Sequence, residues 1–121
     1  MSATDKKPVG VWITRSPFED HRIAERLRMA VGLTLGKNSV RIFLSGDGVY
    51  VLLKSHPEKG GLPPLGKHLE TLGLLKCSLV AEEESLSQGN ISREAVPYPI
   101  EILPREEFLR RVSACQVLFN E

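Results

Sequence analysis

The chain has 121 residues, of which 41% are hydrophobic and 26% are charged, a composition typical of one folded domain rather than a disordered or fibrous chain. Sixteen lysines and arginines against fifteen aspartates and glutamates give a net charge of +1. This charge creates no strong electrostatic field that would attract nucleic acid or an anionic membrane, so neither is expected as a partner. The longest apolar runs, such as residues 49–53, are far shorter than the roughly 20 residues that span a bilayer.

The first eight residues are polar and charged, and they lack the apolar core of a secretory signal. We therefore expect residues 1–8 to be a flexible segment, residues 9–121 to form a single α/β domain, and the protein to be cytoplasmic. Two cysteines, Cys77 and Cys115, are too few for a disulfide framework and lack a CxxC spacing. Neither a metal nor a cofactor is predicted.

The first predicted strand covers residues 9–14 (VGVWIT), a β-branched run typical of a strand buried on both faces. Ser16, Pro17 and Glu19 then have the pattern of a capping box, which predicts a helix that starts within two residues of Pro17. The inward side chains of this helix follow helical spacing: Ile23, Leu27, Ala30 and Val31. The helix is expected to end near Gly36, in the left-handed conformation that glycine permits.

Further along the chain, strands and helices continue to alternate. A strand is predicted over residues 40–44, followed by a glycine turn (SGDG) and a short helix within residues 49–53. The loop over residues 54–64 holds two adjacent glycines and three prolines. The remaining predictions are a helix over 65–74 ending at Gly73, a strand over 77–81, an acidic helix over 82–88, a connection over 90–99, a strand over 100–103, a helix over 104–114 with Phe108, Leu109 and Val112 inward, and a strand over 116–119.

This alternation predicts βαβ units and the α/β class. The expected architecture is a three-layer α/β/α sandwich with a mainly parallel sheet of about five strands. The pattern does not predict the order of the strands.

Ligands of open parallel sheets bind beside the carboxyl ends of strands, where helix N-termini lie. Three segments qualify: residues 15–18, with Arg15 and Ser16 beside a helix start; residues 45–48, with Ser45 and Asp47; and residues 81–84, with Ala81 and Glu82. Each segment also has a plain structural reading. Ser16 and Asp47 can cap helices, and acids in the first turn of a helix stabilise its dipole.

Other motifs are missing or incomplete. The glycine turn is not GxGxxG, and the chain holds no GxxxxGK[ST]. His21, His56 and His68 do not have the HxxxH spacing of metal ligands and are read as solvated side chains.

Three stretches of the chain nevertheless resemble the DsrE/DsrF-like family of intracellular sulfur-transfer proteins, nearest the DsrF or TusC type. They are VWITRSPFEDHRIAERLRMAVGL, VRIFLSGDGVYVLL and LGLLKCSLVAEEESLSQG, and the closing FLRRVSACQVLF is similar as well. The resemblance implies a cysteine at the end of the third strand as carrier of the persulfide. Counted back from Gly89, this position is Ala81, and Cys77 lies four residues earlier.

The resemblance thus favours an accessory or non-catalytic subunit of a sulfur-relay assembly, and enzymatic activity stays open. It also implies a homo- or hetero-oligomer with related DsrE-like subunits and a sulfur-carrier protein as partner, for which residues 49–53 are a candidate apolar contact surface. One alternative is a persulfide sulfurtransferase that uses Cys77 or Cys115. Another is a small-molecule or anion-binding module at Arg15, Ser16, Ser45 and Asp47.

Overall fold

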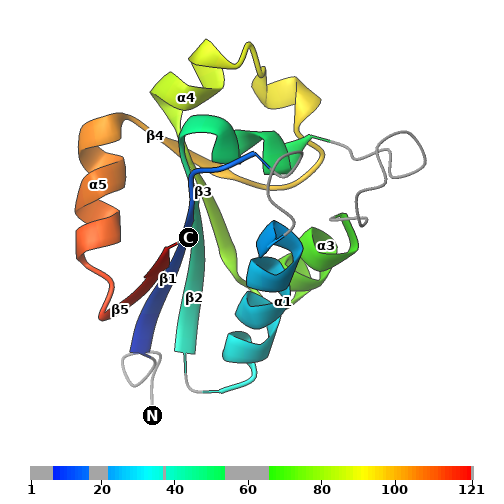
Figure 1. Ribbon diagram of the computed structural model, residues 1–121, viewed down its shortest axis with the longest axis vertical. Helices are drawn as coiled ribbons and strands as arrows, with labels where there is room; N and C mark the ends of the chain where they lie inside the picture. The colour runs from blue at the N-terminus through cyan, green and yellow to red at the C-terminus, as the bar shows by residue number, and fades with distance from the viewer. Residues whose placement is uncertain (1–6, 17–21, 37, 54–65, 121) are drawn as a thin grey trace.

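Five strands form one sheet, the frame of the structure (Figure 1). This computed structural model describes residues 7–16, 22–36, 38–53 and 66–120. The strands are β1 (Lys7–Ile13), β2 (Asn38–Leu44), β3 (Ser78–Glu82), β4 (Glu101–Leu103) and β5 (Val117–Asn120), in the order β4-β3-β2-β1-β5. Every adjacent pair is parallel, which confirms the predicted class and sheet. β1 begins two residues earlier than predicted.

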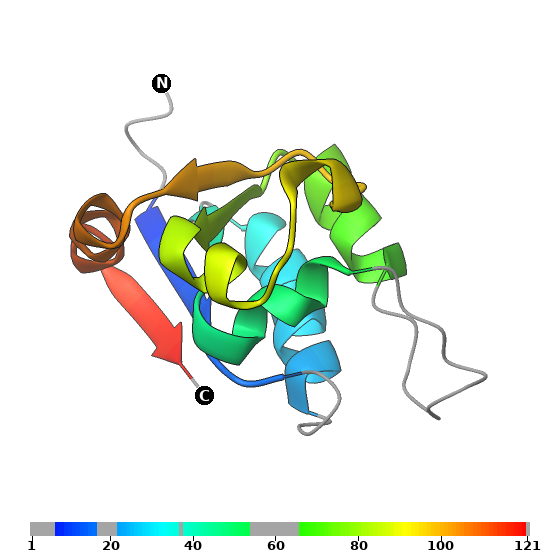
Figure 2. The same ribbon diagram turned by 90° about the horizontal axis from the view of Figure 1, so that it is seen from above.

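Helices cover both faces of the sheet, as a three-layer sandwich requires (Figure 1, Figure 2). α1 (Arg22–Thr34) and α3 (Gly66–Leu74) lie on one face, and α5 (Arg105–Ser113) lies on the other. The short helices η2 (Gly46–Leu52), α4 (Glu83–Gln88) and η3 (Arg93–Ala95) gather at one end of the sheet. Among the described residues, no helix is long and apolar enough to cross a membrane.

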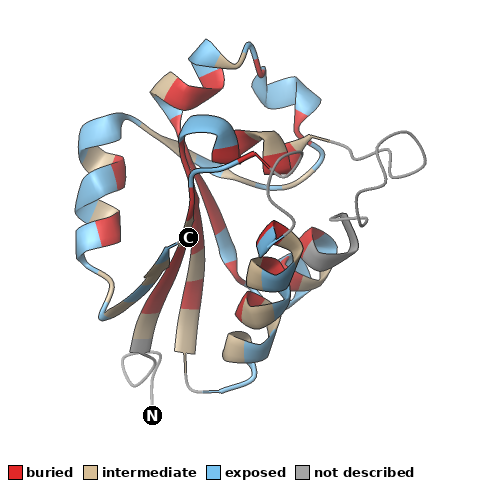
Figure 3. Cartoon of the chain, in the orientation of Figure 1, coloured by how far each residue is buried: buried red, intermediate tan, exposed pale blue. Residues whose placement is uncertain are grey.

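One apolar cluster lies on each face of the sheet. Figure 3 shows that buried residues run along the strands of the sheet. Successive residues of a strand point to opposite faces, so Ile42 and Leu44 pack toward α1 and α3 while Phe43 packs toward α5. The Phe108 ring of α5 meets the Phe43 ring edge-on, with centroids 5.6 Å apart. Because both sides of β2 are covered, Ile42, Phe43 and Leu44 are completely buried.

The predicted inward face of the last helix is partly wrong. Phe108 and Val112 are buried, but Leu109 is 41% exposed. Positions 108 and 112 lie one helical turn apart on the same side, whereas position 109 is rotated about 100° from 108. On α1, Ile23, Leu27 and Ala30 are buried as predicted, while Val31 is half-buried.

α3 ends in a Schellman motif that is not built on a glycine. The Cys77 N–H donates to the Leu72 carbonyl at 2.9 Å, and the Lys76 N–H donates to the Gly73 carbonyl at 3.1 Å. Lys76 occupies the left-handed position with a φ of 62°. The helix therefore continues past Gly73 and ends at Leu74.

α4 ends in the same way, with Asn90 left-handed at a φ of 55°. The Ile91 N–H donates to the Leu86 carbonyl at 2.9 Å, and the Asn90 N–H donates to the Ser87 carbonyl at 3.2 Å. The left-handed end predicted at Gly36 is wrong, because no positive φ occurs at that residue.

Residues 1–6 of the segment expected to be flexible lie outside the described residues, while residues 7 and 8 belong to β1. Two further predictions lie outside the described residues. The first is the helix start at Pro17, with the Glu19 half of its capping box, since α1 is described only from Arg22 onward. The second is the glycine- and proline-rich loop over residues 54–64.

A substitution at Lys76 tests the end of α3. A side chain in the left-handed region costs roughly 1 kcal/mol that glycine does not incur, so Lys76→Gly should raise the free energy of unfolding by about that amount. The matched control Lys76→Ala keeps the left-handed Cβ and should give no gain. Urea midpoints at unchanged m-value measure both, and equal midpoints for the two variants would contradict the assignment.

Candidate functional site

The carboxyl ends of β1, β2 and β3 meet at one edge of the sheet, the upper edge in Figure 1. Ile13 lies in register with Leu44, and Leu44 lies in register with Ala81. This edge therefore brings together the three segments that the sequence nominated, residues 15–18, of which 15–16 are described, residues 45–48 and residues 81–84.

The turn after β2 is tied to the end of β1. The Ser45 N–H donates to the Ile13 carbonyl at 3.2 Å, and the Trp12 indole Nε1 donates to the Ser45 Oγ at 2.9 Å. Ser45 is itself buried. The Ser45 hydroxyl is therefore hydrogen-bonded to a side chain of the same chain and is not directed toward a ligand-binding pocket.

The glycines of this turn are required by geometry. Gly46 has a φ of 56°, which glycine adopts without strain. A Cβ on Gly48 would collide with the Ile13 carbonyl oxygen, so the turn packs directly on the backbone of β1. These glycines permit a backbone contact inside the chain rather than the approach of a ligand.

The cap predicted at Asp47 is wrong. Asp47 lies inside η2 and is exposed, and the N-cap is Ser45, which makes no side-chain capping bond. The Gly46 N–H is satisfied instead by the Ser85 Oγ at 2.8 Å.

The predicted contact surface at residues 49–53 is also wrong, because Val49, Val51 and Leu52 are buried in the chain's own core.

A polar network, buried at Glu82 and Ser85, links the turn to the end of β3. Ser85 accepts from the Gly46 N–H and donates to the Glu82 Oε1 at 2.6 Å. The Arg105 Nε lies 3.3 Å from the Glu82 Oε2, and this side chain of Glu82 is only 7% exposed. The hydrogen bond with Glu82 and then its charge raise the pKa of Arg105. A carboxylate this deeply placed needs such hydrogen-bond partners to offset the loss of contact with water.

The same network attaches α5 to the edge. The backbone N–H of Arg105 donates to the Glu84 carboxylate, at 2.9 Å to Oε1. Ser85, Arg105 and Trp12 thus belong to the site, although the sequence did not nominate them. Arg105 lies 23 residues beyond Glu82 with no spacing pattern to connect them.

Ala81 lies beside this network but is fully buried. It is one residue before the end of β3, pairs with Leu44 and points into the larger core cluster. The position that the family resemblance assigns to the reactive cysteine therefore has neither a sulfur atom nor access to solvent.

The structure gives little support to an anion site at this edge. Arg15 is exposed and Ser16 is buried. The charged side chains that follow β2 and β3 are mostly acidic, with Asp47 and Glu83 exposed. Carboxylates near a bound anion oppose its binding.

Cys77 lies directly before β3, at the amino end of the strand as predicted, and is 8% exposed. Burial raises the pKa of its thiol to about 12. The Cys77 Sγ donates to the Ser78 carbonyl at 3.8 Å. The thiol is therefore neutral near neutral pH and a poor nucleophile.

Cys115 precedes β5 and is half-buried. Burial raises the pKa of its thiol, and the charge of Arg41 offsets part of this rise. The Sγ donates to the Arg111 carbonyl at 3.7 Å. Cys115 is thus the more accessible thiol of the two. It lies at the amino ends of the strands, whereas the polar network lies at their carboxyl ends.

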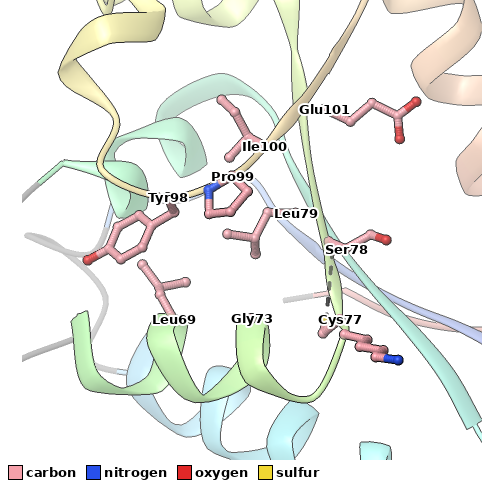
Figure 4. A pocket seen from close by; sticks show the side chains of 10 residues that line it. Leu69, Gly73, Cys77, Ser78, Leu79, Tyr98, Pro99, Ile100 and Glu101 are labelled. Atoms are coloured by element: carbon pink, nitrogen blue, oxygen red, sulfur yellow. Dashed lines mark hydrogen bonds between the residues drawn. The ribbon is translucent and has the colours of Figure 1, made fainter.

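A pocket of about 310 Å³ lies between α3 and the segment that leads into β4 (Figure 4). Leu69, Leu79 and Tyr98 line it, and Cys77 lies at one end. Burial, and then the charge of Glu70, raise the pKa of Tyr98. None of the nominated residues at the carboxyl ends of the strands lines this pocket, so the pocket does not overlap the polar network.

Within the described ranges, no group of three or more histidine, cysteine, aspartate or glutamate side chains is arranged to hold a metal ion. His21, His56 and the side chain of His68 lie outside these ranges. The expectation of a protein without metal stays a prediction.

Comparisons with known proteins agree with this architecture. A model of the DsrE/DsrF-like family matches residues 7–120. The solved ychN protein from E. coli superposes with a TM-score of 0.80 at 20% identity, covering 96% of this chain and 99% of its own. MTH1491 from Methanobacterium thermoautotrophicum, a protein of unknown function, gives a TM-score of 0.67 at 15% identity, covering 97% of this chain and 100% of its own. No curated protein matches the sequence.

Gly48→Ala tests the contact between the turn and β1. The added Cβ would collide with a backbone oxygen, which cannot rotate away, so stability should fall by roughly 3 kcal/mol. Gly32→Ala is the control, because no atom lies within 4 Å of a Cβ there and the residue is inside α1. Chemical denaturation should show equal or greater stability for the control, and a similar loss in both variants would refute the contact.

The buried thiol of Cys77 makes a testable contribution to the pH dependence of stability. Its folded pKa of about 12 exceeds the ordinary 9.0, so the contribution is complete below pH 9 and disappears as pH rises toward 12. Above pH 9 the wild type should lose up to about 1.4 kcal/mol per pH unit more than Cys77→Ala. Urea denaturation across this range measures the difference, and parallel curves for the two proteins would exclude the effect.

Proposed function

The chain belongs to the DsrE/DsrF-like family, and we propose that it acts as a non-catalytic, accessory subunit of a cytoplasmic sulfur-relay assembly. One observation carries the proposal. Where the family resemblance calls for a persulfide cysteine, the chain has Ala81, which is completely buried.

The surroundings of Ala81 support the same role. A persulfide carrier needs an ionisable thiol that both donor and acceptor can reach. Here Glu82, Ser85 and Arg105 occupy the polar positions beside Ala81 and bind one another. These side chains therefore join β3, α4 and α5 at the carboxyl ends of the strands, and we propose that a partner binds the surface they hold in place.

We expect the partners to be related DsrE-like subunits, one of which supplies the cysteine, or further copies of this chain, together with a sulfur-carrier protein. Asp47 and Glu83 are exposed at the carboxyl edge, and a basic partner surface would complement their charge.

A second candidate function is persulfide transfer by the chain itself. The observation in its favour is the half-buried thiol of Cys115 with Arg41 nearby, since a cation stabilises a thiolate. The effect of burial on the pKa of Cys115 is larger than that of Arg41 and acts in the opposite direction. Cys77 is the weaker carrier, because its pKa is raised to about 12.

Mass spectrometry after incubation with a sulfur donor tests the proposal. The native wild type should acquire no adduct of about 32 Da, the mass of one sulfur atom, because neither thiol is both exposed and ionised. Asp47→Cys is the positive control, since it places a thiol at an exposed position of the carboxyl edge. An adduct on the wild type that Cys115→Ser removes would replace the accessory role by the transferase role.

A further inference from the structure

The two outermost strands of the sheet, β4 and β5, differ in how open they are to pairing with another strand. β4 has only three residues and lies between Pro99 and Pro104, which have no N–H to donate. Its Glu101 is exposed and paired with Arg111 of α5, at 3.3 Å between Oε2 and the guanidinium. Short length, flanking prolines and charge are the features that keep an edge strand from pairing with another chain.

β5 is also short, with four residues, but it has neither the flanking prolines nor the charged side chains. Its sequence VLFN contains no proline and no charge, and within the described residues it pairs with β1 alone. Leu118 lies in register with Gly10, on the face that α5 covers, and is 36% exposed. Val117 and Phe119 point to the other face and are half-buried. The edge thus presents unpaired peptide groups between apolar side chains on both faces.

We infer that a second copy of this chain covers this edge, with the two β5 strands paired antiparallel about a twofold axis at Leu118. In that register Leu118 lies opposite its own copy on one face, and Val117 lies opposite the second copy's Phe119 on the other. All three central pairs are apolar. The pairs at the ends join Gln116 to Asn120, which are both polar.

The strand itself excludes the neighbouring registers. Leu118 and Phe119 point to opposite faces, so they cannot lie opposite each other in a pair that keeps the faces of the two sheets continuous. An axis at Phe119 would place Leu118 opposite Asn120, an apolar side chain against a polar one. VLFN is therefore most complementary to itself about Leu118, and this favours a second copy over an unrelated peptide.

The inference adds a contact surface to the subunit role proposed above. It rests on that proposal in one respect, namely that the chain forms an oligomer. It also replaces residues 49–53 as the contact surface, since Val49, Val51 and Leu52 are already buried. The pairing joins two five-stranded sheets into one continuous sheet across the twofold axis.

Light scattering of the full chain at micromolar concentration provides the first test. The wild type should have an even multiple of the 13.4 kDa chain mass, and Leu118→Lys should lower it to half or less, because the pairing places two charges opposite each other. Leu109→Lys is the matched control on α5, where the leucine is similarly exposed at 41%, and it should leave the mass unchanged. A monomeric wild type, or a Leu118→Lys variant with unchanged mass, would overturn the inference.

Disulfide trapping tests the register and does not depend on the lysine variant folding. Residues opposite each other in antiparallel strands have Cα atoms about 4.5–5.5 Å apart, within the range a disulfide spans. In a background with both native cysteines replaced by alanine, Leu118→Cys should oxidise to a covalent dimer, whereas Val117→Cys and Leu109→Cys should not. Equal trapping at the three positions, or none at Leu118, would refute the register. The sulfur-adduct experiment is independent of these masses, so the proposed function can stand or fail separately.

Discussion

The architecture depends on a close contact between two pieces of backbone, the glycine turn after β2 and the carbonyl of Ile13 at the end of β1. Only a residue without a Cβ fits at Gly48, so the turn can lie directly on the strand. From this position η2 places Val49, Val51 and Leu52 in the core. The Gly46 N–H then points at Ser85, and the rest of the carboxyl edge is organised around that bond.

Glu82 imposes the second constraint, because a carboxylate this deeply buried has to be fully hydrogen-bonded. Ser85 and Arg105 meet that requirement and in doing so join β3, α4 and α5. In an open α/β sheet this edge is the usual place for a ligand. Here the polar side chains of Glu82, Ser85 and Arg105 are bound to one another.

Sequence patterns predicted the strands, the class of fold and the three segments that meet at the edge, because apolar periodicity and turn residues are local signals. They did not predict contacts between distant residues. Arg105 meets Glu82 across 23 positions, and Lys76 is left-handed although a glycine lies three residues away. Residues 49–53 looked like an exposed surface because a short apolar run does not reveal which element covers it. That α5 is the helix on the face of Phe43 likewise became evident only with the strand order.

The position of β1 has a consequence for the order of folding. This first strand lies between β2 and β5, and Val9 pairs with Val117, which is 117 − 9 = 108 positions later. Contacts that close such a long loop carry a large entropic cost and form late. While the chain leaves the ribosome, β1 can pair early with β2, but its other side stays open until β5 emerges. During synthesis the nascent sheet therefore has an outer strand, β1, with one side unpaired, a stage at which association with a neighbouring chain competes with completion of the fold.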